Sequence, residues 1–338
     1  MSSVRLRRVS EPDDEPWSEA SARRRLARLA SALPVPIQDP WFLPSYSNDA
    51  WRLGEMVLRV CWRGDRQRFV KEAALAATLP REVGYPDLIA AGEAQAMTWM
   101  ITRRVDGSTL DNVWLDPDAG RVRSILDDFG ARLRALHAWR PTGDAAALLR
   151  THAEAPAETA EAVVGRDVMP LPIGRSALLV PAAKALAFID PGVVDAAWAR
   201  MTELADLDPF AGPPPDGVAH CDATYPNILV EGARVSALLD FEWARLAPPW
   251  VELVAWTRLL EDLREEGVRP PPVLEQLEAS YPALFDVPRL RERLWLGELA
   301  YTLRHMVFWA PDAPEDRLAR DHPLHRLRRL LDRPIPWS

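Results

Sequence analysis

A short stretch of this chain places three oxygen-bearing side chains where they could accept a proton and hold a metal ion. Asp222 and Asn227 lie in one polar segment, and Asp240 follows the next apolar run. A carboxylate can accept the proton of a hydroxyl group that attacks phosphorus. Carboxylate and amide oxygens are also hard ligands of the kind that Mg²⁺ accepts, with water and phosphate oxygens completing its shell. These residue types predict phosphoryl transfer that depends on Mg²⁺.

The apolar residues between Asn227 and Asp240 predict the hairpin that would bring these two side chains together. Residues 228–230 predict a buried strand, residues 231–233 a tight turn and residues 235–239 the returning strand. Because the strands of a hairpin end side by side, Asp240 is expected beside Asn227.

Each of these residues alone has a simpler interpretation. Asp and Asn are common turn formers, and an Asp after an apolar strand often caps a helix. The order of the residues and the hairpin between them favour the functional interpretation. Cys221 lies between a His and an Asp, but neighbours in an extended segment point to opposite faces and cannot form a nucleophilic relay. Cys221 is interpreted as a small filler.

The residues after Asp240 separate two types of kinase. Protein kinases combine H-x-D-x-x-x-x-N with Asp-Phe-Gly and a long activation segment that presents a peptide. Here Asp240-Phe241-Glu242 is soon followed by Pro248, and a helical pattern of apolar residues begins at Val251. The gap is too short for a peptide platform, which favours a small-molecule acceptor that carries a hydroxyl group.

The sequence from His220 to Glu252 resembles the aminoglycoside phosphotransferase family of small-molecule kinases. The segments HCDATYPNILV, LLDFEWA and PPWVELVAW carry the resemblance, which is traceable upstream to about Ser47. It implies an α+β, two-lobed protein-kinase-like fold with a small antiparallel-sheet N-lobe and a larger, mainly helical C-lobe. It also implies roles in the catalytic loop: Asp222 as catalytic base, Asn227 and Asp240 as Mg²⁺ ligands, and His220 as support for the loop.

The upstream half resembles the nucleotide-binding part of the same family, with ATP or GTP as the expected co-substrate. Ser47 and Asn48 take the place of the loop that covers the phosphates. Arg59 takes the place of the phosphate-binding Lys on the third strand, and Glu72 that of the helix acid that orients it. Residues 98–107 resemble a strand and hinge; the expected nucleotide contacts there are Arg103 and Val105.

Two features depart from the family pattern. The loop around Ser47 and Asn48 has no glycine, so close backbone approach to phosphate is harder there, and side-chain donors are expected to substitute. Arg59 replaces a Lys, but Lys71 and Lys184 are the only lysines among 41 basic residues. Arg is the usual cation of this chain, and a guanidinium can bind phosphate oxygens in pairs. The simpler alternative for Arg59 is a surface strand residue that pairs with a nearby acid.

Composition narrows the class of protein. The formal charge of −8 argues against nucleic acid as a partner. Two cysteines give neither a metal pattern nor a disulfide framework. The charged start shows no signal peptide, and no uncharged run is long enough to span a bilayer, so the expected location is the cytoplasm. The sequence leaves the oligomeric state open.

The chain of 338 residues is long enough for two lobes with separate cores. Residues 1–16 are charged and are expected to be disordered. Residues 17–105 are expected to form the nucleotide-binding N-lobe, and residues 106–338 the C-lobe with the catalytic loop and the substrate site. Three residues of this C-lobe are weaker candidates for substrate contacts, namely Trp243, Glu252 and Glu298. For Glu252, support of the metal-binding loop and helix capping remain as alternatives.

Three functions fit these features. By resemblance, the leading hypothesis is phosphorylation of an antibiotic, in resistance or self-protection. The second is a biosynthetic kinase that acts on a sugar, a nucleoside or an amino alcohol. The third is a nucleotide-binding pseudokinase that serves as a scaffold, although the presence of the base and both metal ligands argues against it.

Overall fold

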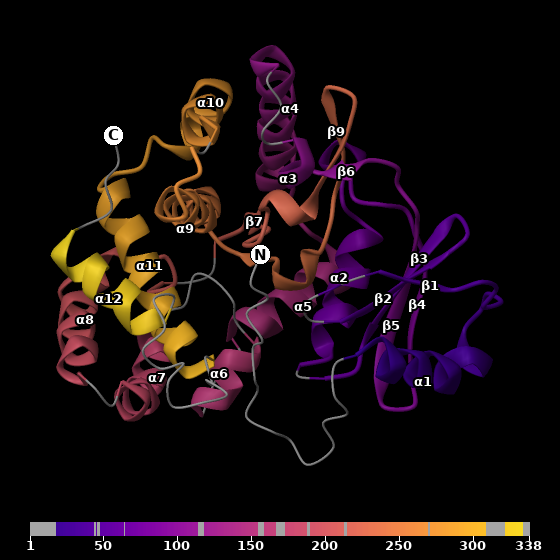
Figure 1. Cartoon of the computed structure of the whole chain (residues 1–338), viewed down its shortest axis with the longest axis horizontal. Helices are drawn as coiled ribbons and strands as arrows, with labels where there is room; N and C mark the ends of the chain where they lie inside the picture. Colours follow the sequence, from indigo (N-terminus) through magenta and orange to yellow (C-terminus); the bar gives the residue numbers. More distant parts are fainter. Residues whose placement is uncertain are drawn as a thin grey trace.

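The computed structural model of the chain describes residues 18–333 except 44, 46–47, 64, 114–117, 155–158, 167–172, 188–189, 213–214, 270 and 309–321. Its first part contains an antiparallel sheet, and the rest is mainly helical. The sheet lies on one side of Figure 1, and the helices from the C-terminal part lie on the other. The expected disordered segment, residues 1–16, lies outside the described residues.

The sheet has the strand order β1-β2-β3-β5-β4, and every neighbouring pair is antiparallel. Its strands are β1 (Trp41–Leu43), β2 (Asp49–Leu53), β3 (Met56–Cys61), β4 (Leu88–Ala94) and β5 (Met97–Arg103). The strand expected to carry Arg59 and the strand expected within residues 98–107 are therefore present as β3 and β5.

Side chains of the central strands point alternately to the two faces of the sheet, and both faces are buried. Leu58 and Val60 of β3 pack with helix α1 (Glu19–Leu29), whereas Cys61 packs with Phe69 of helix α2 (Gln67–Ala76). Successive strand residues point to opposite faces. Arg59 therefore faces the same side as Cys61, toward α2.

A buried ion pair joins helix α1 to the strand that follows the predicted phosphate loop. The Arg25 guanidinium donates from Nε and Nη2 to the two oxygens of Asp49, at 2.6 and 2.7 Å. Both side chains are almost fully buried, and the guanidinium also lies 3.9 Å from the centroid of the Trp62 ring. Such a bidentate pair fixes direction as well as distance, so α1 holds the start of β2 in place.

Short strands frame the catalytic segment. The hairpin predicted from the sequence is present, with β6 (Ser108–Thr109), β8 (Ile228–Glu231) and β9 (Arg234–Leu238) forming one sheet and β7 (Val218–Ala219) pairing with β10 (Arg245–Leu246). Gly107 precedes β6 with φ of 139°, and a Cβ there would come within 2.7 Å of Ser236 Oγ and 2.9 Å of the Val230 carbonyl oxygen. Only glycine fits that position.

Helices make up most of the remaining described residues. Those around the catalytic segment are α3 (Leu110–Val113), α4 (Ala119–Ala138), α5 (Gly143–Glu154), α9 (Glu252–Glu265) and α10 (Val273–Ser280). A second group lies at the left and lower left of Figure 1. It contains α6 (Ala160–Arg166), α7 (Ile173–Leu186), α8 (Gly192–Glu203), α11 (Leu290–Phe308) and α12 (Pro323–Asp332). The second group shares an apolar core that is separate from the core around α4 and α9.

Local hydrogen bonds set the ends of two helices. Helix α4 begins at Ala119, because the Asp118 side chain accepts hydrogen bonds from the backbone N–H groups of Gly120 and Arg121 and so caps it. Helix α1 ends at Leu29 and continues as a 3₁₀ turn to Ala32. Across the described ranges, no helix combines the length and apolar character needed to cross a bilayer.

We expect Arg25→Met to destabilise the fold by about 3 to 5 kcal/mol, because Asp49 would be left as a buried charge without its partner. The double variant Arg25→Met/Asp49→Leu should recover most of that loss. Urea unfolding measures both. Arg23→Met is the matched control, since its exposed pair with Glu19 is worth less than about 1 kcal/mol. Equal losses in Arg25→Met and Arg23→Met would contradict the importance of the buried pair.

Candidate active site

The catalytic loop brings Asp222 and Asn227 into direct contact. The amide nitrogen of Asn227 donates to the Asp222 side-chain oxygen Oδ2 at 3.0 Å and to its backbone carbonyl at 2.9 Å. With the nitrogen facing Asp222, the amide oxygen is the atom of Asn227 that can serve as a metal ligand. The Leu239 N–H donates to the Asn227 carbonyl at 2.8 Å. The hairpin therefore returns beside Asn227, as its spacing predicts.

The surroundings of Asp222 favour its protonated form. Burial and the nearby Asp240 carboxylate raise the pKa of Asp222 to about 8, while Arg258 and the hydrogen bond from Asn227 act in the opposite direction. A carboxylate with a raised pKa is a stronger base than an ordinary one. Once deprotonated, Asp222 can therefore accept the proton of a hydroxyl group more readily than an ordinary carboxylate.

Glu252, at the start of α9, binds the backbone of the catalytic loop. Its carboxylate accepts the backbone N–H of His220 on one oxygen and that of Cys221 on the other, the latter at 3.1 Å. His137 Nε2 lies 3.4 Å from the first oxygen. The side chain is 1% exposed. Its expected contact with substrate is therefore corrected: Glu252 holds the loop backbone, because both oxygens are engaged inside the protein.

His220 is buried and links the two halves of the catalytic segment. Its ring Nε2 donates to the Leu239 carbonyl at 2.8 Å, and its Nδ1 accepts the backbone N–H of Asp222 at 3.3 Å. The ring thus joins the loop that carries Asp222 to the strand end that precedes Asp240. Burial, the largest cause, raises the pKa of the neighbouring Cys221 thiol, which is thereby kept unreactive.

Two site residues have left-handed backbone conformations. Cys221 has φ of 65° and Asp240 has φ of 64°, although neither is a glycine. Such conformations cost roughly 1 kcal/mol or more and persist where the surrounding structure holds them. The two bends flank Asp222 and carry Asp240, whose carboxylate is close enough to raise the pKa of Asp222.

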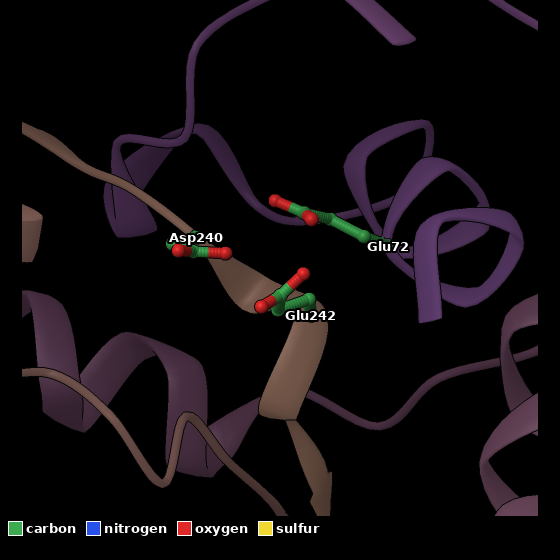
Figure 2. Close-up of side chains that lie close together, drawn as sticks. All are labelled: Glu72, Asp240 and Glu242. Carbon is green, nitrogen blue, oxygen red and sulfur yellow. The ribbon is translucent and has the colours of Figure 1, made fainter. Parts of the chain in front are cut away.

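Arg59 bridges the N-terminal helix acid and the second Asp. Its Nη1 donates to Glu72 Oε1 at 2.7 Å, and its Nη2 lies 2.5 Å from Asp240 Oδ1. Burial lowers the pKa of this guanidinium, but the Asp240 and Glu72 carboxylates raise it by more, so the group is charged. In Figure 2, Glu72 extends from α2 toward Asp240 and Glu242, which lie on the segment after β9. The alternative of a surface strand residue does not hold, because Arg59 faces this cluster.

Glu72 also fixes the segment that carries Asp240. The same Oε1 accepts the Tyr85 hydroxyl at 2.8 Å and the Phe241 backbone N–H at 3.0 Å. Glu72 is fully buried. A buried carboxylate with three donors is firmly held, so α2 and the residues after β9 form one unit.

Asn48 contacts protein rather than open space. Its amide nitrogen donates to Glu242 Oε2 at 2.9 Å, and Arg68 Nη1 donates to Glu242 Oε1 at 3.0 Å. Asn48 is 2% exposed. This amide nitrogen is therefore committed to Glu242, and the expected donation from Asn48 to phosphate would require that contact to break. Ser47 lies outside the described residues.

The remaining candidates lie apart from this cluster or on its edge. Arg103 is mostly exposed, and its backbone N–H donates to the Asp87 carbonyl at 2.8 Å. Val105 is half-buried in the link that follows β5. Trp243 is half-buried, and the Arg68 guanidinium lies 4.6 Å from the centroid of its ring.

Glu298 requires a correction. It is fully buried in α11, where it pairs with Arg326 of α12 at 2.9 Å. A side chain with no exposed surface cannot be reached by a substrate, so Glu298 stabilises the contact between two helices. The expected substrate contact is withdrawn.

A comparison with models of protein families identifies the chain. The model of the phosphotransferase enzyme family (APH) matches residues 42–293, which is well over half of the sequence. The chain belongs to this phosphotransferase family. It is therefore a small-molecule kinase, as its sequence pattern predicted. A search of curated proteins finds no match.

Solved structures of aminoglycoside phosphotransferases share the fold. A thermostable mutant of APH(4)-Ia in its apo form matches with a TM-score of 0.57 and 18% identity, over 88% of this chain and 95% of that one. The gentamicin complex of APH(2")-IIa matches with a TM-score of 0.62 and 12% identity, over 95% and 97%. APH(3'')-Id from Streptomyces rimosus matches with a TM-score of 0.53 and 16% identity, over 86% and 99%. At these identities the likeness establishes the fold, and the predicted two-lobed, kinase-like α+β fold is confirmed.

Sequence reasoning missed several residues of this phosphotransferase site. Glu242, Arg68 and Tyr85 hold the cluster together, and Arg258 lies close enough to Asp222 to lower its pKa. A signal was present only for Glu242, which is an acid where protein kinases have glycine. The others become visible only through contacts between distant parts of the chain.

The donor set fits a hard divalent cation. Asp240 offers a half-buried carboxylate and Asn227 an amide oxygen, and both belong to the segment that the hairpin closes. Oxygen ligands of this kind suit Mg²⁺. Histidine and thiol ligands, which softer metals prefer, do not lie among the acidic groups that cluster in the described part of the site.

We expect Glu252→Ala to lower both stability and turnover. Loss of the carboxylate leaves the His220 and Cys221 N–H groups without a buried acceptor, at a cost of about 1 to 3 kcal/mol each. Urea unfolding and steady-state kinetics would measure the two effects. Exposed Glu203→Ala is the control, because its pair with Arg200 lies at the surface. An unchanged unfolding midpoint in Glu252→Ala would show that the loop does not need this support.

Proposed function

We propose that this chain transfers the γ-phosphoryl group of ATP or GTP, with Mg²⁺, to a hydroxyl group of a small molecule, and that an antibiotic is the leading acceptor. The observation that carries the proposal is the contact between Asp222 and Asn227 beside the Arg59 bridge from Glu72 to Asp240. This arrangement supports the proposal, because phosphoryl transfer needs a base, oxygen ligands for a metal ion and a cation near one another. Residues 17–105 are proposed to hold the nucleotide, and the cytoplasm is the proposed location.

The proposed mechanism uses position and charge without a covalent intermediate. Asp222 accepts the hydroxyl proton of the acceptor, and Asn227 orients Asp222 through their hydrogen bond. Asn227 and Asp240 would hold Mg²⁺, which when bound neutralises charge on the β and γ phosphate oxygens. His220 and Glu252 keep the loop in the shape that this requires. The rate enhancement would come from orientation and electrostatics.

The nucleotide is proposed to lie against the sheet. Arg59 would contact the α and β phosphates, and its hydrogen bond to Glu72 would keep the guanidinium in position. Ser47 and Asn48 remain proposed for the phosphate loop, and the link around Arg103 and Val105 for the base. Support comes from a related structure, a ternary complex of an APH(4)-Ia mutant with AMP-PNP and hygromycin B, which matches with a TM-score of 0.57 and 16% identity, over 93% of this chain and 98% of that one.

The proposed acceptor is a hydroxylated antibiotic, in resistance or self-protection. The complexes with gentamicin and hygromycin B support this class by family relationship. The short link from Asp240 to the first turn of α9 supports a small acceptor over a peptide. Trp243, which is half-buried beside this link, remains a proposed contact for an acceptor ring.

One observation favours a second candidate, a biosynthetic kinase for a sugar, nucleoside or amino alcohol. Arg258 is half-buried on α9, lies 3.9 Å from the centroid of the Tyr301 ring, and lowers the pKa of Asp222. A guanidinium near the base repels an acceptor that carries several positive charges. This arrangement favours a neutral acceptor, such as a sugar or a nucleoside, over a polycationic aminoglycoside.

We expect Asp222→Asn to lower turnover by at least about a hundredfold, because the amide cannot accept the hydroxyl proton. The fold and nucleotide affinity should be kept, since the substitution preserves shape. Exposed Asp216→Asn is the matched control and should leave turnover unchanged. Asp222→Asn turnover within a few-fold of the wild type would remove Asp222 from the role of base.

Mass spectrometry tests the acceptor class. The protein would be incubated with Mg²⁺ and ATP or GTP and with aminoglycosides, macrolides, nucleoside antibiotics, sugars, amino alcohols and a generic protein. We expect the mass gain of one phosphoryl group on an antibiotic. Gain only on primary metabolites would favour the second candidate, and gain on the protein alone would contradict the small-molecule proposal. Nucleotide binding without transfer to any compound would favour a scaffold role.

A further inference from the structure

Three carboxylates lie near the Arg59 guanidinium, and two of them are in close contact with it. Its Nη2 lies 2.5 Å from Asp240 Oδ1 and 3.8 Å from Glu242 Oε2, while its Nη1 stays with Glu72 at 2.7 Å. Figure 2 shows the three carboxylates directed toward a common space. The guanidinium therefore has a second carboxylate within reach of the nitrogen that now contacts Asp240.

The Arg59 guanidinium is one of two cations in contact with this acidic cluster, the other being Arg68 on Glu242. Oxygen atoms of Glu72, Asp240 and Glu242 lie within 4.8 Å of one another, a spacing that would attract a metal ion if nothing else neutralised it. Arg59 lies among them and takes one oxygen of Asp240. Because two cations at one carboxylate oxygen repel each other, the contact with Arg59 disfavours metal binding at that oxygen.

Glu242 is placed to receive Arg59. It is fully buried and is held on one oxygen by Arg68 at 3.0 Å and on the other by Asn48 at 2.9 Å. Each carboxylate oxygen can accept more than one hydrogen bond. A movement of roughly 1 Å would bring Nη2 from its present distance to hydrogen-bonding range of Glu242, and Nη1 could remain on Glu72.

We propose that Arg59 and the metal ion compete for Asp240, and that Glu242 is the positioning residue that accepts the guanidinium when the metal binds. The inference rests on the proposed role of Asp240 as a metal ligand. Arg59 keeps two carboxylate partners in either position, so the exchange leaves no buried charge unpaired. Since Asn48 binds the same Glu242 oxygen, the exchange also changes the surroundings of the phosphate loop.

Binding of Mn²⁺ to the nucleotide-free protein tests the competition without catalysis, by the loss of the free-ion signal in electron paramagnetic resonance. Arg59→Met should bind Mn²⁺ at least about fivefold more tightly than the wild type, because the competitor is gone. Glu242→Gln should bind it at least about threefold more weakly, because the displaced guanidinium loses its second partner.

The double variant Arg59→Met/Glu242→Gln separates positioning from other roles. If Glu242 acts through Arg59, the weakening caused by Glu242→Gln should largely disappear when Arg59 is absent. A direct metal ligand or a purely structural residue would keep its full effect in both backgrounds. Arg23→Met removes an exposed cation of the same type and should leave Mn²⁺ affinity unchanged.

Asp240→Ala distinguishes failure of this inference from failure of the proposed function. Mn²⁺ binding that survives Asp240→Ala overturns the metal role of Asp240 and the competition with it. Mn²⁺ binding that Asp240→Ala abolishes but Arg59→Met does not strengthen overturns the competition alone.

A crystal structure of the wild type with Mg²⁺ and AMP-PNP gives a second test should Arg59→Met not fold. We expect Arg59 Nη2 within about 3.2 Å of Glu242 and out of contact with Asp240. An intact contact between Arg59 and Asp240 beside a bound metal ion would overturn the proposal.

Discussion

A carboxylate that leaves water must find donors or cations inside the protein, and this constraint shapes the whole site. Asp49, Glu72, Glu242 and Glu252 are all buried, and each satisfies the constraint by joining parts of the chain that are distant in sequence. Glu72 joins α2 to the segment after β9, and Glu252 joins α9 to the catalytic loop. The relative positions of the elements that form the site thus depend on which carboxylates are buried.

The same constraint connects the N-terminal sheet with the segment that follows β9. Asn48 and Glu242 are 194 residues apart in the chain and meet through a buried hydrogen bond. Arg25 holds Asp49, the neighbour of Asn48, so helix α1 is linked to this contact through the backbone. Together these contacts hold Asn48 and the start of β2 against Glu242 and helix α1.

The sequence predicted the site residues that lie close together along the chain. Asp222, Asn227 and Asp240 belong to one loop and one hairpin, so a short range of sequence determines their arrangement, and their contacts agree with it. The family pattern extended this to Arg59 and Glu72. Glu252 and Glu298 were assigned to substrate because their burial depends on partners far along the chain: the loop at residues 220–221 and Arg326. Such partners leave no periodic signal in a single sequence.

The guanidinium on β3 has a consequence for chemical labelling of this kinase. An acylating reagent needs an uncharged amine to react with, and a guanidinium that stays protonated is no nucleophile. The chain has only two lysines. Lys71 is buried in α2, and Lys184 of α7 pairs with Asp195 of α8. A covalent reagent aimed at an amine on β3 would therefore find a guanidinium at position 59.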